Sequence, residues 1–166
     1  ILETALSDRP RQAHLAADVS SELHSLNEHG AGELVSVTSL DAEDAIRDWG
    51  SPDFVKIDAE GEERRIIEGG RSFFSRHSPL VMFEVKAGHT IDRAIPEAFR
   101  ALGYRIFRLL PGAPILVPFG PDDALDGVEL NRFAAQPDRV AELALDGRCP
   151  EARPAWSPDE EARAWA

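Results

Sequence analysis

The clearest pattern of apolar and polar positions lies between residues 52 and 85. The run from Phe54 to Ile57 is aromatic or β-branched at three of its four positions, which predicts a strand. The acidic residues and the glycine at 58–63 predict an abrupt turn, and the apolar residues after them recur at helical spacing. A second apolar run at 79–85 predicts another strand. A strand, a helix and a second strand in this order are typical of parallel α/β sheets, so we expect an α/β fold.

Weaker patterns add elements on both sides of this unit. Tyr104–Leu110 and Ile115–Phe119 lie on either side of Pro111, Gly112 and Pro114, so they predict an antiparallel hairpin. Gly69 and Gly70 predict a division of the helix after the central strand into two pieces. The other expected elements are strands at 1–6, 12–17 and 33–38, helices at 41–49, 91–102 and 137–145, a loop at 86–90 and a short connection at 131–133.

Carboxylates follow both of the strongest predicted strands. Asp58 and Glu60 come directly after the central strand, and Glu84 ends the strand at 79–85. Because neighbouring parallel strands end side by side, at the edge where α/β proteins bind ligands, we expect these three side chains in one cleft. His89 lies in the next loop and is a candidate general base, since histidine titrates near neutral pH. The alternative is that the acids cap turns and that His89 is an exposed loop residue.

The stretch "DFVKIDAEGEERRIIEGG", followed by "PLVMFEV", resembles the centre of the FkbM-family methyltransferases. The pattern of that family here is Lys-Ile-Asp, a hydrophobic residue, Glu-Gly, a variable residue and Glu. Ala59 stands where Val is common, and Glu62 stands where His is common. "ALSD" at 5–8 and "VTSLD" at 37–41 extend a resemblance that covers roughly residues 1 to 120. The matching residues are Lys56, Ile57, Asp58, Glu60, Gly61 and Glu63.

The resemblance implies a partial class I methyltransferase sheet, Rossmann-like and mostly parallel, that ends in an antiparallel hairpin. It also implies S-adenosylmethionine as cofactor and O-methylation of a small molecule or sugar hydroxyl. Ser7 and Asp8 follow the strand at 1–6, which by resemblance is the third strand of the sheet, with its tip near the adenine of the cofactor. With Asp58 they are the candidate cofactor-binding residues, and the alternative is that Ser7 or Asp8 caps a turn. The glycine-rich cofactor loop of the family is not recognisable before residue 50. We therefore expect the C-terminal portion of a longer methyltransferase, inactive by itself.

Composition narrows the expected partners. The net charge of −12 argues against nucleic acid or an anionic membrane surface. Cys149 is the single cysteine, so no internal disulfide forms, which suits a reducing cytoplasm. No apolar run approaches the ~20 residues that span a bilayer. We expect a cytoplasmic protein that acts on a small molecule, from a bacterial gene of high GC content, with one domain at 1–148 and a linker and tail at 149–166.

The implied reaction moves a methyl group from a sulfonium to an oxygen nucleophile, which requires in-line positioning and a group that takes the hydroxyl proton. Asp58, Glu60 and His89 are the candidates for that group. Alternatively, Asp58, Glu60 and Glu84 hold a divalent cation such as Mg²⁺ that lowers the hydroxyl pKa, although no metal site is assigned. Two other functions stay open: a non-catalytic Rossmann-like remnant or interaction domain that lacks the cofactor site, and a different Rossmann-like enzyme whose acids bind a sugar or a metal.

Overall fold

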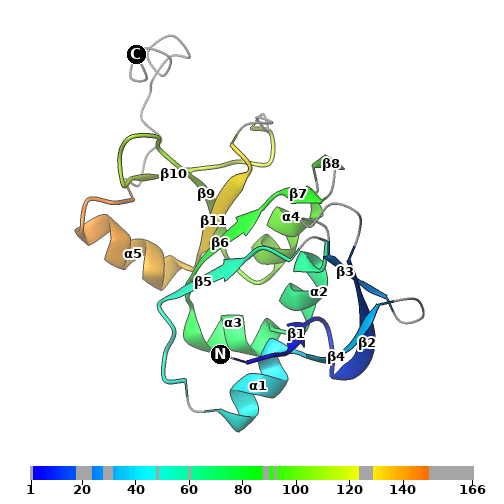
Figure 1. Ribbon diagram of the computed structural model, residues 1–166. Helices are drawn as coiled ribbons and strands as arrows, with labels where there is room; N and C mark the ends of the chain where they lie inside the picture. Colours follow the sequence, from blue (N-terminus) through cyan, green and yellow to red (C-terminus); the bar gives the residue numbers. More distant parts are fainter. Residues whose placement is uncertain are drawn as a thin grey trace.

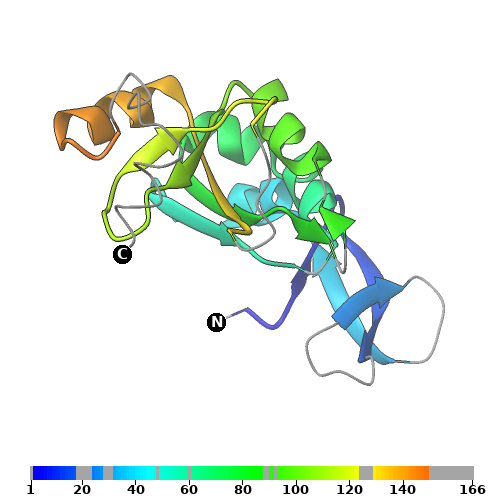
Figure 2. The same cartoon turned by 90° about the horizontal axis from the view of Figure 1, so that it is seen from above.

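The structure is a computed structural model of the 166-residue chain and describes residues 2–17, 24–27, 32–47, 49–59, 61–87, 90–91, 93–123 and 129–149. Within these residues the strands form three sheets, with the orders β10-β9-β11-β6-β5, β1-β4-β2-β3 and β7-β8. Figures 1 and 2 show the four-stranded sheet beside the five-stranded sheet and its helices. The strands are β1 (Ala5–Leu6), β2 (Arg11–Ala17), β3 (His24–Asn27), β4 (Glu33–Thr38), β5 (Phe54–Ile57), β6 (Leu80–Glu84), β7 (Lys86–Ala87), β8 (Thr90–Ile91), β9 (Arg105–Leu109), β10 (Leu116–Pro118) and β11 (Asn131–Ala135). The helices are α1 (Leu40–Ile46), α2 (Glu63–Glu68), α3 (Arg71–His77), α4 (Ala94–Ala101) and α5 (Pro137–Leu145).

The five-stranded sheet is mixed. β5 and β6 are adjacent and parallel, with Phe54 opposite Leu80 and Ile57 opposite Phe83, as the sequence predicted. The predicted hairpin is also present, since β9 and β10 pair antiparallel. β11 is antiparallel to both of its neighbours. The expectation of a mostly parallel sheet is therefore not confirmed, whereas the α/β class is confirmed.

Strand β11 occupies a place that the sequence did not indicate. Residues 131–133 were expected in a short connection, but Asn131–Ala135 lies between β6 and β9 and pairs with both. The local signal is weak because Ala134 and Ala135 have low strand propensity. Both alanines are fully buried, Ala134 in one core cluster of the molecule and Ala135 in the other. Pairing on both sides thus overrides local propensity.

The N-terminal strands form a separate sheet. Among residues 2–6, the described part of the expected strand at 1–6, only Ala5 and Leu6 pair, and they run parallel to Val37 and Thr38 of β4. β2 and β3 extend this sheet by antiparallel pairing, and β3 was not predicted. The expected loop at 86–90 instead contributes two short antiparallel strands, β7 and β8.

The helix after β5 divides as the two glycines predicted. α2 ends before Gly69 and α3 begins after Gly70. A Cβ atom added at Gly69 would lie 2.4 Å from the backbone oxygen of Ser7, a distance at which atoms overlap. Glycine at 69 therefore allows α2 to end directly against the carboxyl end of β1.

Helices cover both faces of the five-stranded sheet. Ile106 and Ala134 belong to the core shared with α2, α3 and α4, whereas Phe107 and Ala135 belong to the core shared with α5. Successive residues of a strand point to opposite faces, so α5 packs on the face opposite to the other three helices. The core of the first face includes an aromatic cluster, with edge-to-face and tilted contacts among Phe73, Phe74, Phe83, Phe99 and Tyr104.

Candidate functional site

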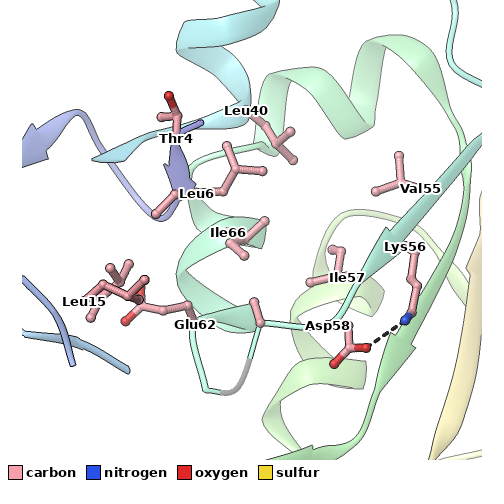
Figure 3. A pocket seen from close by; sticks show the side chains of 13 residues that line it. Thr4, Leu6, Leu15, Leu40, Val55, Lys56, Ile57, Asp58, Glu62 and Ile66 are labelled. Atoms are coloured by element: carbon pink, nitrogen blue, oxygen red, sulfur yellow. Dashed lines mark hydrogen bonds and ion pairs between the residues drawn. The ribbon is translucent and has the colours of Figure 1, made fainter. Parts of the chain in front are cut away.

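A cavity of about 310 Å³ lies between the carboxyl end of β5 and strand β1. Figure 3 shows the apolar side chains of Leu6, Val55, Ile57 and Ile66 around this space. Polar side chains border it at Asp58 and Glu62, and at Thr4 and Lys56. The size and the mixture of apolar walls with a few polar groups are typical of small-molecule sites.

Asp58 lies directly after β5 and borders the cavity. Its Oδ2 atom is 2.7 Å from the Nζ atom of Lys56, because side chains two residues apart in extended backbone point the same way. The side chains are 42% and 54% exposed, so water screens this pair. The hydrogen bond from Lys56 to Asp58, followed by the charge of Asp58, raises the pKa of Lys56. The pair therefore orients the Asp58 carboxylate rather than stabilising the fold.

Glu84 lies at the end of the neighbouring strand. Ile57 is opposite Phe83, so Asp58 and Glu84 are the next residues along the two parallel strands. The charge of Glu84 also contributes to raising the pKa of Lys56, after the larger effects of Asp58. The structure thus brings Asp58, Lys56 and Glu84 together at one sheet edge, although Glu84 does not line the cavity. Glu60 and His89 lie outside the described residues, and the catalytic roles of all four candidates stay predictions.

Glu62 is a cavity residue that the sequence analysis missed. Its side chain is 13% exposed, its Oε2 atom accepts a hydrogen bond from Ser7 Oγ at 2.7 Å, and its Oε1 atom accepts one from Arg65 Nη1 at 3.1 Å. The sequence indicated only that Glu62 belongs to the acidic turn at 58–63. The available signal was that Glu62 stands at the position where the resembled family commonly has histidine.

Ser7 and Asp8, the other cofactor candidates, are engaged in internal contacts. Ser7 is fully buried, and its Oγ atom lies 3.1 Å from Asp8 Oδ1 as well as close to Glu62; its single proton serves one of them at a time. Arg11 Nη1 donates to both Ser7 and Asp8. Burial opposes ionisation of Asp8, but the hydrogen bond from Ser7 and the charges of Arg9 and Arg11 outweigh it and lower the pKa of Asp8. Neither residue lines the cavity, and their cofactor role stays a prediction.

Two other findings concern ions and membranes. In the part of the chain that the structure describes, no group of three or more His, Cys, Asp or Glu side chains is arranged to hold a metal ion. The divalent-cation alternative included Glu60, which is outside that part, so it stays a prediction. Among the described helices, none has the length and apolar character needed to cross a membrane.

The fold and the cavity define an α/β protein with a largely apolar cavity at the carboxyl edge of a mixed sheet. The sequence matches the methyltransferase FkbM domain family over residues 5–106, a segment that runs from β1 into β9 and includes every residue bordering the cavity except Thr4. The chain therefore belongs to the FkbM methyltransferase domain family.

Similarity to individual proteins is more distant. A crystal structure of methyltransferase FkbM from Methylobacillus flagellatus KT has 18% sequence identity to this chain and a TM-score of 0.40. The alignment covers 78% of this chain and 26% of that one, so the chain spans about a quarter of the length of that protein. No curated protein matches the sequence.

Proposed function

We propose that the intact protein transfers a methyl group from S-adenosylmethionine to a hydroxyl group of a small molecule. The observation that carries this proposal is the position of Asp58: a carboxylate at the carboxyl end of β5 borders an apolar cavity within a segment that matches a methyltransferase family. The cofactor would supply a methyl group activated on a sulfonium sulfur. Carboxylates at Asp58 and Glu62 suit a ligand that carries hydroxyl groups and a positive charge.

In the proposed reaction, different residues of this chain would bind the ligand, accept the proton and orient the carboxylate. The apolar wall formed by Leu6, Val55 and Ile66 would hold the apolar part of a ligand and exclude water. Asp58 would accept the proton of the substrate hydroxyl or hold that hydroxyl in line. Lys56, at 2.7 Å from Asp58, would fix the direction of the carboxylate.

The test is methyl transfer by the intact protein from isotopically labelled S-adenosylmethionine to a panel of small hydroxyl compounds. Labelled product that disappears with Asp58→Asn supports the proposal. If the folded intact protein transfers no label to any compound of the panel, the non-catalytic alternative is favoured.

Calorimetric titration of the 166-residue chain with S-adenosylmethionine is a second measurement. We expect no tight binding, because these residues contain no recognisable glycine-rich loop to supply backbone donors to the cofactor. Micromolar binding would contradict this expectation and would place the cofactor site within the described sheet edge.

A further inference from the structure

One buried acid at the turn after β5 is not among the residues that border the cavity described above. Glu63 is 2% exposed. Its Oε1 atom accepts a hydrogen bond from the backbone N–H of Ala59 at 3.0 Å, and its Oε2 atom accepts one from the N–H of Gly61 at 2.9 Å. A single carboxylate thus binds two amides of the turn, and hydrogen bonds to an ionised acceptor are stronger than neutral ones.

These contacts serve the turn rather than the helix that contains Glu63. An acid in a first helical turn ordinarily stabilises its own helix through the amides and the dipole of that end. Glu63 is the first residue of α2, but both of its oxygens point back to residues that precede the helix cap at Glu62. The turn has further constraints: Gly61 has a φ of +106°, which favours glycine, and Glu62 N–H donates to Ala59 O at 3.2 Å.

The contact with Ala59 has a direct consequence for Asp58. The N–H group of Ala59 belongs to the same planar peptide unit as the carbonyl group of Asp58. Fixing that amide therefore fixes the plane that follows the Asp58 Cα atom. The direction of the Asp58 side chain, which meets Lys56 at 2.7 Å, depends on this plane.

We propose that Glu63 is a positioning residue of this site, which holds the turn through Ala59 and Gly61 so that the Asp58 carboxylate keeps its place beside Lys56 at the border of the cavity. The expected effect on methyl transfer rests on the proposed function. The expected effects on the amides of the turn and on the pKa of Lys56 do not depend on it.

The test compares Glu63→Gln with Glu68→Gln in the 166-residue chain. Glutamine keeps the volume of glutamate but has one acceptor oxygen, so it can retain only one of the two amide contacts. Glu68 is on the same helix, and its side chain is 56% exposed, which makes it a matched control. Two properties are measured by NMR: hydrogen exchange of the Ala59 and Gly61 amides relative to amides of β6, and the pKa of Lys56.

For Glu63→Gln we expect at least one of the two amides to exchange about tenfold faster, while the amides of β6 change little. We also expect the pKa of Lys56 to fall toward its ordinary value, because Asp58 would no longer be held beside it. Glu68→Gln should change neither property. Gly61→Ala is a second variant: its Cβ meets no atom within 4 Å, but the residue is strained at a positive φ, so it should also lower the pKa of Lys56.

In the intact protein, Glu63→Gln should lower kcat by about tenfold with little change in KM, as expected for a misplaced catalytic group. The positioning role is overturned if both amides and the Lys56 pKa stay as in the parent, or if Glu63→Gln does not fold, which would make Glu63 a determinant of the fold. If the NMR changes occur but the parent protein transfers no methyl group, the proposed function fails and the positioning of Asp58 by Glu63 stands.

Discussion

The parallel strands β5 and β6 have polar groups at both ends, and the two ends differ in what those groups contact. At the amino ends, Ser78 Oγ donates a hydrogen bond to Asp138 Oδ1 at 2.6 Å. Arg139 Nη2 lies 3.2 Å from Asp53 Oδ1. These contacts join helix α5 to the starts of both strands (Figure 1).

At the carboxyl ends, the acids border open space instead. Asp58 and Glu62 line a cavity of about 310 Å³ whose walls are mostly apolar, and Asp58 and Lys56 are both exposed. The polar side chains thus contact helix α5 at the amino ends, whereas at the carboxyl ends they border the cavity. Substitutions at the amino ends should change the free energy of unfolding, whereas substitutions at the carboxyl ends should change turnover.

The largest expected effect is that of Asp58→Asn in the intact protein. Turnover should fall by about a hundredfold, the scale of losing an acid–base or positioning group, and Glu60→Gln should act similarly. The melting temperature should change little, because the Asp58 side chain is 42% exposed. Kinetics with labelled cofactor and thermal unfolding measure the two effects.

The matched control is Asp53→Asn, at the other end of the same strand. The Asp53 side chain is 86% exposed and is paired with Arg139, so turnover should stay at the parent level. Full turnover in both Asp58→Asn and Glu60→Gln would show that these acids only cap the turn. If one of the variants does not fold, the substituted acid is needed for folding and its role in turnover is not supported.

The parts of the fold that the sequence predicted have local signals. Phe54–Ile57 and Leu80–Glu84 are apolar runs between turn residues, and both are strands. Gly69 and Gly70 divide the helix because one of them lies against Ser7. In each case the element could be predicted because the residues that form it also have the local pattern that indicates it.

The parts that the sequence did not predict depend on distant residues. β11 is a strand because it pairs with β6 on one side and with β9 on the other. The residues Asn131–Ala135 themselves carry no signal of this pairing. In the site, strand-end spacing indicated Asp58 and Glu84, but the contact of Glu62 joins it to Ser7, 55 residues earlier. The contacts of Glu63 are local, but the sequence indicated only an abrupt acidic turn at 58–63 and not the two amides that Glu63 binds.

At the amino ends, Ser78→Ala should cost about 1–2 kcal/mol of unfolding free energy at neutral pH, because it removes a hydrogen bond to a carboxylate. The hydrogen bond from Ser78 is the largest cause that lowers the pKa of Asp138 in the folded protein. A lowered carboxyl pKa stabilises the fold fully above the unfolded-state value near 3.8, and this stabilisation is lost as pH falls through the folded-state pKa. The difference between variant and parent should therefore shrink below about pH 3.8.

Urea unfolding at pH 7 and at acid pH measures this difference, with Ser75→Ala, at an exposed position of α3, as the control. An unchanged difference at acid pH would show that the cost comes from Ser78 itself, whose φ of +47° is uncommon for a residue other than glycine, and not from its bond to Asp138.

The smallest expected effect is that of Tyr104→Phe, also at the amino ends. The buried Tyr104 hydroxyl donates to the carbonyl oxygen of Phe74 at 2.9 Å, and burial raises the pKa of Tyr104, so the donor stays protonated. That oxygen also accepts from Ser78 N–H at 3.1 Å and from Gln136 Nε2 at 3.5 Å. A carbonyl oxygen has two lone pairs, so losing one of three donors should cost only about 0.5–1 kcal/mol, without pH dependence between pH 5 and 9.

Removing a second donor should cost more than removing the first, because the remaining contact can no longer compensate. We therefore expect Tyr104→Phe with Gln136→Leu to lower the unfolding free energy by more than the sum of the single variants, measured by a double-mutant cycle in urea. Additive costs would show that the long contact from Gln136 does not share the Phe74 oxygen. Turnover of the intact protein should stay the same in all three variants, because these side chains lie at the end of the strands away from Asp58. A loss of turnover without a loss of stability would contradict the comparison, because it would show that side chains at the amino ends of β5 and β6 also contribute to catalysis.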